Sequence, residues 1–190
     1  MPSAEYDIRY LQAGMSLLED YLLSADLYWP VGASPPPGEP PYPRLTLGGM
    51  LLARKRAQAY SLTTNQQAEF AQLVQQMDAV RSRWRSAWGQ KAAREFRSRL
   101  NLWGNFLEDY RENPSANADR YRYEVGRRVQ LQLLADEAID LPQSDLDLLN
   151  GLDRVLQAAL IPGRFIWDEE LASGFPRETY WYLYGNLKSR

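Results

Sequence analysis

The sequence predicts an all-α protein: a single domain over residues 1–190, folded as a helical bundle on one long, straight or kinked, central helix. Apolar residues recur every three to four positions along most of the chain, which is the spacing of one helix face. No internal repeat and no run of strand-like segments breaks this pattern. Hydrophobic residues make up 45% of the 190 positions, which is enough for a sizeable core in one domain.

The first helix is predicted from Ser3, an N-cap residue, to about Leu27, and Pro30 ends it. Residues 30–45 then form a Pro-rich connector, since seven of its first fourteen residues are proline. Such a segment cannot be helix or central strand and is typical of a stiff polyproline-like loop. Its P-x-x-P spacing also occurs in partner-docking motifs, although we interpret it as a rigid tie between two helices. The second helix is predicted over 46–60.

The central helix is predicted from Thr64 to Arg111. Thr64 and Gln67 form a capping-box pattern at its start. The apolar residues that follow keep one helical phase across Gly89, and no proline occurs before Pro114. A continuous helix over this span would be on the order of 70 Å long, at about 1.5 Å per residue. The alternative is a hairpin broken at Gly89, because a glycine often marks a turn.

Two further helices are predicted over 117–139 and 144–160, separated by Pro142. Apolar residues lie all round the first of them, which indicates burial on several sides. The tail, residues 164–190, is rich in aromatic side chains. We expect it to pack on the bundle through a loop and one short helix that begins at Pro176, because proline suits the first turn of a helix.

The chain has no histidine and no cysteine. These absences exclude an imidazole base, a thiolate nucleophile, a Ser-His-Asp triad and a zinc site of the usual ligands. We therefore predict no catalytic residue, no cofactor and no metal ligand. With 22 basic and 24 acidic residues the net charge is −2, so overall charge does not draw the chain to nucleic acid. No apolar run suits a membrane span and no signal-peptide pattern is present, so we expect a cytoplasmic bacterial protein.

The segment 81–99 combines seven basic residues with two tryptophans and a single acid, Glu95. Guanidinium groups bind phosphate and aromatic rings stack on bases, so the outward-facing arginines predict a nucleic-acid face: Arg83, Arg94 and Arg97. The other arginines lie beside the apolar stripe and predict an anion or partner site: Arg81, Arg85 and Arg99, with Trp84 and Trp88. The alternative for this second set is pairing with Glu95 and with acids of neighbouring helices: Glu19, Asp20, Asp136 and Glu137.

Acidic residues spaced three apart occur on two successive predicted helices, as Asp109 with Glu112 and Glu137 with Asp140. Such pairs share a helix face and can hold Mg²⁺. The arrangement is similar to that of all-α nucleotide pyrophosphatases, which implies a carboxylate–magnesium nucleotide hydrolase. Chance alone produces pairs at this spacing in a chain with 24 acids, so we rank this interpretation last.

Three segments together resemble a family of uncharacterised bacterial all-α proteins: Tyr42–Gly48, Lys91–Phe96 and Trp103–Glu108. The resemblance extends over most of the chain and implies no activity, cofactor or catalytic residue.

A long helix in a chain of this size would leave apolar surface uncovered, which favours self-association or a partner protein. The sequence therefore predicts a non-enzymatic interaction or scaffold protein, either a homo-oligomer such as a dimer or a subunit of a complex, without membrane association. The alternative is binding of nucleic acid or a phosphate ligand through residues 81–99.

Overall fold

The computed structural model describes residues 1–189 and confirms the all-α class. Besides the helices, the chain contains a small two-stranded sheet near its C-terminal end. Among the described residues, no helix combines the length and the apolarity that crossing a membrane requires. The elements are α1 (Ala4–Met15), α2 (Leu18–Leu23), α3 (Leu47–Ala59), α4 (Thr64–Arg83), α5 (Arg85–Glu112), α6 (Pro114–Asn117), α7 (Tyr121–Glu137), α8 (Gln143–Ala159), β1 (Leu160–Phe165) and β2 (Tyr184–Leu187).

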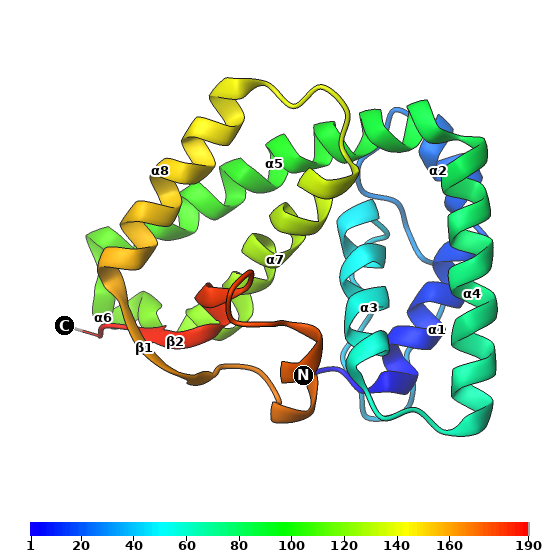
Figure 1. Cartoon of the computed structure of the whole chain (residues 1–190), viewed down its shortest axis with the longest axis horizontal. Helices are drawn as coiled ribbons and strands as arrows, with labels where there is room; N and C mark the ends of the chain where they lie inside the picture. The colour runs from blue at the N-terminus through cyan, green and yellow to red at the C-terminus, as the bar shows by residue number, and fades with distance from the viewer. Residues whose placement is uncertain (190) are drawn as a thin grey trace.

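Figure 1 shows two groups of helices that α5 joins. Helices α1, α3 and α4 stand side by side in one group, and α5, α7 and α8 pack together in the other. Helix α3 also packs against α7, and the tail passes back across the molecule so that residues 169–174 contact α3. The contact between α3 and α7 is one place where the two groups meet, and α5 also contacts α2, α3 and α4.

The predicted central helix is wrong, because the chain turns sharply at Trp84, between α4 and α5 (Figure 1). Trp84 leaves the helical conformation with φ −107° and ψ 33°. Its N–H still donates to Val80 and its carbonyl still accepts from Trp88, at 2.9 and 2.8 Å. One non-helical residue redirects the helix axis without disturbing the apolar spacing, so the phase of the pattern does not reveal the corner.

The alternative, a hairpin broken at Gly89, is also wrong, since Gly89 lies inside α5 and is buried. A Cβ atom at position 89 would lie 2.7 Å from Cγ2 of Ile139. The glycine therefore allows the segment after α7 to pack directly on α5, and it does not mark a turn.

The first predicted helix is two helices, because α1 ends at Met15 and α2 begins at Leu18. Its predicted start is confirmed, since the Ser3 hydroxyl accepts a backbone N–H of the first turn. The predicted capping box of α4 is displaced by one residue and consists of Thr63 and Gln66. Helices α7 and α8 begin four residues later and one residue earlier than predicted.

Residues 30–45 contain no helix, as their proline content predicts. The two ends of this connector are tied together where Trp29 and Leu45 exchange backbone hydrogen bonds of 3.0 and 2.7 Å. The hydroxyl of Tyr6 donates to the carbonyl oxygen of Pro41 (3.3 Å), which holds the connector against α1. The connector is therefore a closed loop with a fixed position beside α1.

The tail packs on the bundle, with Phe175 and Tyr182 fully buried, but the helix expected from Pro176 is absent from the described residues. Short 3₁₀ turns replace it, and β1 pairs antiparallel with β2, so that Leu160 lies opposite Leu187. The aromatic side chains of the tail are committed to tertiary packing, and this outweighs the preference of proline for a first helical turn.

Candidate functional site

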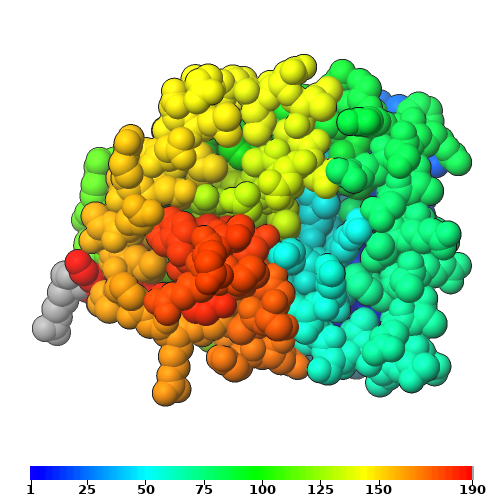
Figure 2. Space-filling model, viewed as in Figure 1, coloured from blue at the N-terminus to red at the C-terminus, as the bar shows by residue number. Residues whose placement is uncertain are grey.

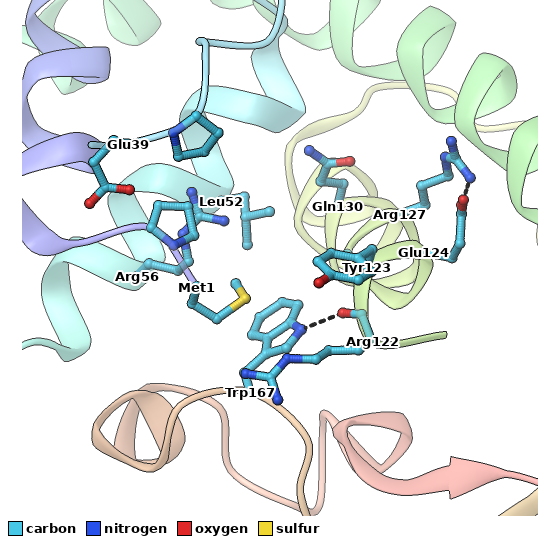
Figure 3. A pocket seen from close by; sticks show the side chains of 13 residues that line it. Met1, Glu39, Leu52, Arg56, Arg122, Tyr123, Glu124, Arg127, Gln130 and Trp167 are labelled. Atoms are coloured by element: carbon cyan, nitrogen blue, oxygen red, sulfur yellow. Dashed lines mark hydrogen bonds and ion pairs between the residues drawn. The ribbon is translucent and has the colours of Figure 1, made fainter. Parts of the chain in front are cut away.

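A groove of about 880 Å³ opens between α3 and α7, where the two groups of helices meet. Figure 3 shows the α3 wall facing the α7 wall, with the tail below them. Its lining comprises Leu52 and Arg56 of α3, Arg122, Tyr123, Glu124, Gly126, Arg127 and Gln130 of α7, Glu39 and Pro40 of the connector, Trp167 of the tail, and Met1 and Pro2.

Helical spacing explains which side chains form the two walls. Leu52 and Arg56 are four residues apart on α3, and Tyr123 and Arg127 are four residues apart on α7, so each pair shares a helix face. Gly126 presents no side chain between them, and the nearest atom to a Cβ there would be Cζ2 of Trp167 at 3.9 Å. The indole ring therefore packs close to α7 at Gly126.

A buried ion pair underlies the α3 wall. The Asp7 carboxylate is fully buried, and Arg56 donates to it from Nε (2.8 Å) and from Nη2 (2.5 Å). Burial raises the pKa of the Asp7 carboxyl group, and the Arg56 charge opposes that rise. The pair joins α1 to α3 and fixes the Arg56 guanidinium at the edge of the groove.

Trp167 and Arg122 fasten the tail to α7. The indole N–H of Trp167 donates to the backbone carbonyl of Arg122 (3.0 Å), and the Arg122 guanidinium pairs with Asp168 (2.9 Å) (Figure 3 shows the first of these). Trp167 is buried, whereas Arg122 is exposed. The indole ring is thus a fixed apolar surface at the bottom of the groove, with a cation next to it.

Tyr123 and Arg127 lie on the α7 wall of the groove, and Tyr123 is far more accessible than Arg127. Tyr123 is 79% exposed, although it is a large aromatic residue. Arg127 pairs with Glu124, which also pairs with Arg120 (3.2 Å), so one carboxylate serves two guanidinium groups. Burial lowers the pKa of Arg127, and the positive charges of Arg99 and Arg120 lower it further. A second carboxylate placed beside Arg127 would relieve this repulsion.

Arg99, from the inward-facing set, is held by its own chain where α5 meets the start of α3. It donates to Glu95 (2.7 Å) and to the hydroxyl of Thr46 (2.9 Å). Glu95 is buried and also accepts the N–H of Gly48 (3.0 Å). The guanidinium therefore completes a network within the core.

The rest of the inward-facing set lies at the corner between α4 and α5. Arg81 pairs with Glu137 (2.5 Å), which also accepts the indole N–H of Trp88 (2.9 Å). Trp84 is half-buried, and its indole nitrogen has no hydrogen-bond partner among residues 1–189. Arg85 is exposed. The structure thus brings Arg81 and Trp88 together at Glu137, whereas Arg99 pairs separately with Glu95.

The outward-facing arginines are exposed, and a phosphate would compete with partners that they already have. Surface contacts of this kind are individually weak, so they reduce the affinity of such a face without abolishing it. The partners are Glu19 for Arg83 (3.0 Å), the carbonyl of Ala25 for Arg94 (3.3 Å) and Asp145 for Arg97 (3.5 Å).

The two acidic pairs lie towards opposite ends of α5. Glu137 contacts the first turn of α5 through Trp88, whereas Asp109 is in its last turn and lies 3.5 Å from Arg120. About twenty residues of helix separate these places, which is on the order of 30 Å. Within residues 1–189, no group of three or more potential metal ligands is placed to hold an ion.

No local sequence pattern indicates the groove as a whole, because Arg56, Tyr123 and Trp167 belong to segments that meet only in the folded chain. One local signal was present. Tyr123 and Arg127 follow each other at helical spacing between charged neighbours, and an exposed tyrosine beside arginine is typical of partner-binding surfaces.

Comparison of the chain with protein-family models, with curated proteins and with solved structures gives no match. The resemblance of Tyr42–Gly48, Lys91–Phe96 and Trp103–Glu108 to a bacterial family therefore stays a prediction.

Proposed function

We propose that this chain is a non-enzymatic interaction protein, and that the groove between α3 and α7 binds a segment of a partner protein. The observation that carries this proposal is the combination of an exposed tyrosine, a fixed indole ring and arginines around one open groove: Tyr123, Trp167, Arg56, Arg122 and Arg127. Tyrosine, tryptophan and arginine contribute most of the binding energy in protein interfaces.

The ionic groups of the groove suit binding better than catalysis. Arg56, Arg122 and Arg127 each pair with a carboxylate of the chain, namely Asp7, Asp168 and Glu124. Guanidinium groups do not lose their proton in the physiological pH range, so they position anions and do not transfer protons. These cations are also spread over two helices, whereas small-ligand sites direct a few polar groups at one place.

The chemistry of the walls specifies the partner segment. Burial lowers the pKa of Arg127, and the charges of Arg99 and Arg120 lower it further. Because Glu124 is shared between Arg127 and Arg120, this position favours a second, incoming carboxylate. Leu52 and Trp167 line the same groove from buried positions, and the ring of Tyr123, 79% exposed, supplies its accessible apolar surface. We therefore expect a segment in which an aspartate or glutamate follows or precedes a large apolar side chain.

Selection from a displayed library of random peptides tests this proposal with the whole chain as the target. We expect the enriched peptides to combine acidic and large apolar residues. Tyr123→Ala and Arg127→Glu should each weaken their capture at least about tenfold, because both side chains line the groove. Arg83→Glu is the matched control, since Arg83 is an exposed arginine with one ion pair at the corner remote from the groove.

Two results would overturn the proposal. One is a selection that enriches no common sequence. The other is a set of peptides that bind the two groove variants as tightly as they bind the unaltered chain. Loss of binding with Arg83→Glu alone would point to the corner between α4 and α5 instead.

A further inference from the structure

Helix α8 presents two apolar faces, and only one of them is covered. Leu149 and Leu156 are buried on the inner face, and Leu152 reaches α5, where it lies 3.7 Å from the position of a Cβ at Gly104. Leu148 and Val155, seven residues apart, point outwards with 48% and 43% of their surface exposed. Figure 2 shows α8 at the surface of the molecule, in yellow and light orange. The outer face is therefore accessible along the helix.

The outer residues follow the spacing of a coiled-coil seam. The positions Ser144, Leu148, Gly151, Val155 and Ala158 alternate steps of four and three residues, which is the a/d spacing of a heptad repeat. Large residues occupy the a positions and small residues the d positions. Isolated exposed apolar residues are common on protein surfaces and need no explanation. Leu148 and Val155, however, share the a position and have the small residue Gly151 between them, so they form a surface into which a second helix fits.

The charges on one flank of this seam decide what the second helix is. Asp147 and Arg154 both occupy the g position, seven residues apart, and both are exposed. Asp147 accepts a hydrogen bond from the amide of Gln143 (2.9 Å), and neither charge forms an ion pair within residues 1–189. The flank thus carries one charge of each sign at equal distances from its midpoint near Asn150 and Gly151.

We propose that two copies of this chain associate through the outer face of α8, as an antiparallel helix pair about a two-fold axis at this midpoint. The axis places Asp147 of each copy beside Arg154 of the other, so two complementary ion pairs form at once. It also places the large a residues opposite the small d residues, so the seam closes without collision.

A parallel pair would not use these charges. In a parallel coiled coil a g residue meets an e residue of the next heptad on the other helix, so Asp147 and Arg154 would face the uncharged Leu152 and Ala159. The remaining e residue, Asp145, is buried and pairs with Arg97. No residue of α8 lines the groove between α3 and α7, so the inference is independent of the proposed function.

Sedimentation equilibrium of the whole chain over a concentration series tests the proposal. We expect a dimer that dissociates on dilution. Asp147→Arg alone and Arg154→Asp alone each place like charges opposite each other twice, so each variant should be monomeric. A mixture of the two variants restores both opposite-charge pairs and should form a heterodimer. The double variant with both substitutions should form a dimer again.

Three results would overturn the proposal: a monomer at every concentration of the unaltered chain, dimers that persist in both single variants, or single variants that stay monomeric when mixed. Circular dichroism melting of each variant establishes that it is folded. Because both substituted side chains are exposed, we expect melting temperatures close to that of the unaltered chain.

Discussion

The guanidinium of Arg56 binds both oxygens of the buried Asp7 carboxylate, which fastens α3 to α1 beneath the groove. The same helix carries a second pair two residues earlier, Arg54 with Asp78 of α4 (2.7 Å), and this pair is partly exposed. The two pairs have the same chemistry and differ in burial. Comparing the two pairs therefore separates the effect of burying the charges on stability from the effect of forming the ion pair itself.

Removing the buried acid should destabilise the fold far more than removing the exposed one. Asp7→Ala leaves the Arg56 charge without its partner, and we expect the free energy of unfolding to fall by about 3–5 kcal/mol. Asp78→Ala should lower it by less than about 1 kcal/mol, since solvent screens that pair. Urea denaturation of the two variants measures both values. Equal losses would contradict the account of the α1–α3 contact.

Lys91 lies in the core and forms no ion pair with a carboxylate within residues 1–189. It is fully buried, and its ammonium donates to the carbonyl oxygens of Ser24 (2.9 Å) and Asp26 (2.8 Å) and lies 4.3 Å from the centroid of the Tyr21 ring. Burial, and after it the nearby charge of Arg94, lower the pKa of Lys91 to about 8, although Asp26 and Glu95 oppose the shift. The group thus fastens the end of α2 to α5 while it retains a proton less readily than lysine in water.

This lowered pKa predicts a specific pH dependence. Between a folded-state pKa of about 8 and the ordinary value of 10.5, the unfolded chain binds a proton that the folded chain does not. The contribution of Lys91 to the free energy of unfolding should therefore rise with pH across this interval. The measurement is that free energy for the unaltered chain minus that for Lys91→Met, taken at intervals from pH 7 to about pH 10. The buried tyrosines contribute equally to the free energy of unfolding of the unaltered chain and of Lys91→Met, so their contribution cancels in the difference. A difference that stays constant or falls would contradict the prediction.

Two glycines of α5 should respond in opposite ways to the same substitution. Gly104→Ala adds a methyl group 3.7 Å from Leu152, and we expect it to raise the free energy of unfolding by up to about 1 kcal/mol, because alanine favours helix. Gly89→Ala places the methyl group 2.7 Å from Ile139, so crowding should outweigh that gain and lower the stability. Thermal melting of the two variants compares them. A gain in the free energy of unfolding at both positions would contradict the inference that Ile139 leaves no space for a methyl group at position 89.

The arginines of residues 81–99 should bind nucleic acid weakly. Arg81, Arg83, Arg97 and Arg99 each pair with an acid of the chain. We therefore expect fluorescence anisotropy to detect any binding of labelled single- or double-stranded DNA or RNA only at low salt, with no binding near 0.15 M salt. Affinity that survives at this salt concentration would revive the nucleic-acid interpretation.

Capping and breaking residues made much of the helical fold predictable. Thr46 caps α3, whose bounds lie within one residue of the prediction, and Ser3 caps α1. These signals act through hydrogen bonds to the nearest turn, so they can be recognised from a few adjacent residues. The corner at Trp84 could not be recognised in this way, because a single residue left the helix without a breaker and without a change of phase.

The sheet and the groove depend on contacts between distant segments. Strand β2 has four residues, and its partner β1 directly follows α8, so neither gives a distinct strand pattern. The groove unites α3, α7 and the tail, and no spacing within one segment reports that Tyr123 and Trp167 lie together. In the arginine-rich segment, by contrast, the spacing of Glu95 and Arg99 at i and i+4 already indicates an ion pair, and the structure contains it.

The most direct test of the groove is the affinity of one selected acidic peptide for the unaltered chain and for Arg127→Glu, measured by titration calorimetry. The account predicts a loss of at least about tenfold, equivalent to ~1.4 kcal/mol. It also predicts that a peptide with lysine in place of the acid binds Arg127→Glu better than it binds the unaltered chain. Equal affinities across the four combinations would contradict a partner-binding role for the groove between α3 and α7.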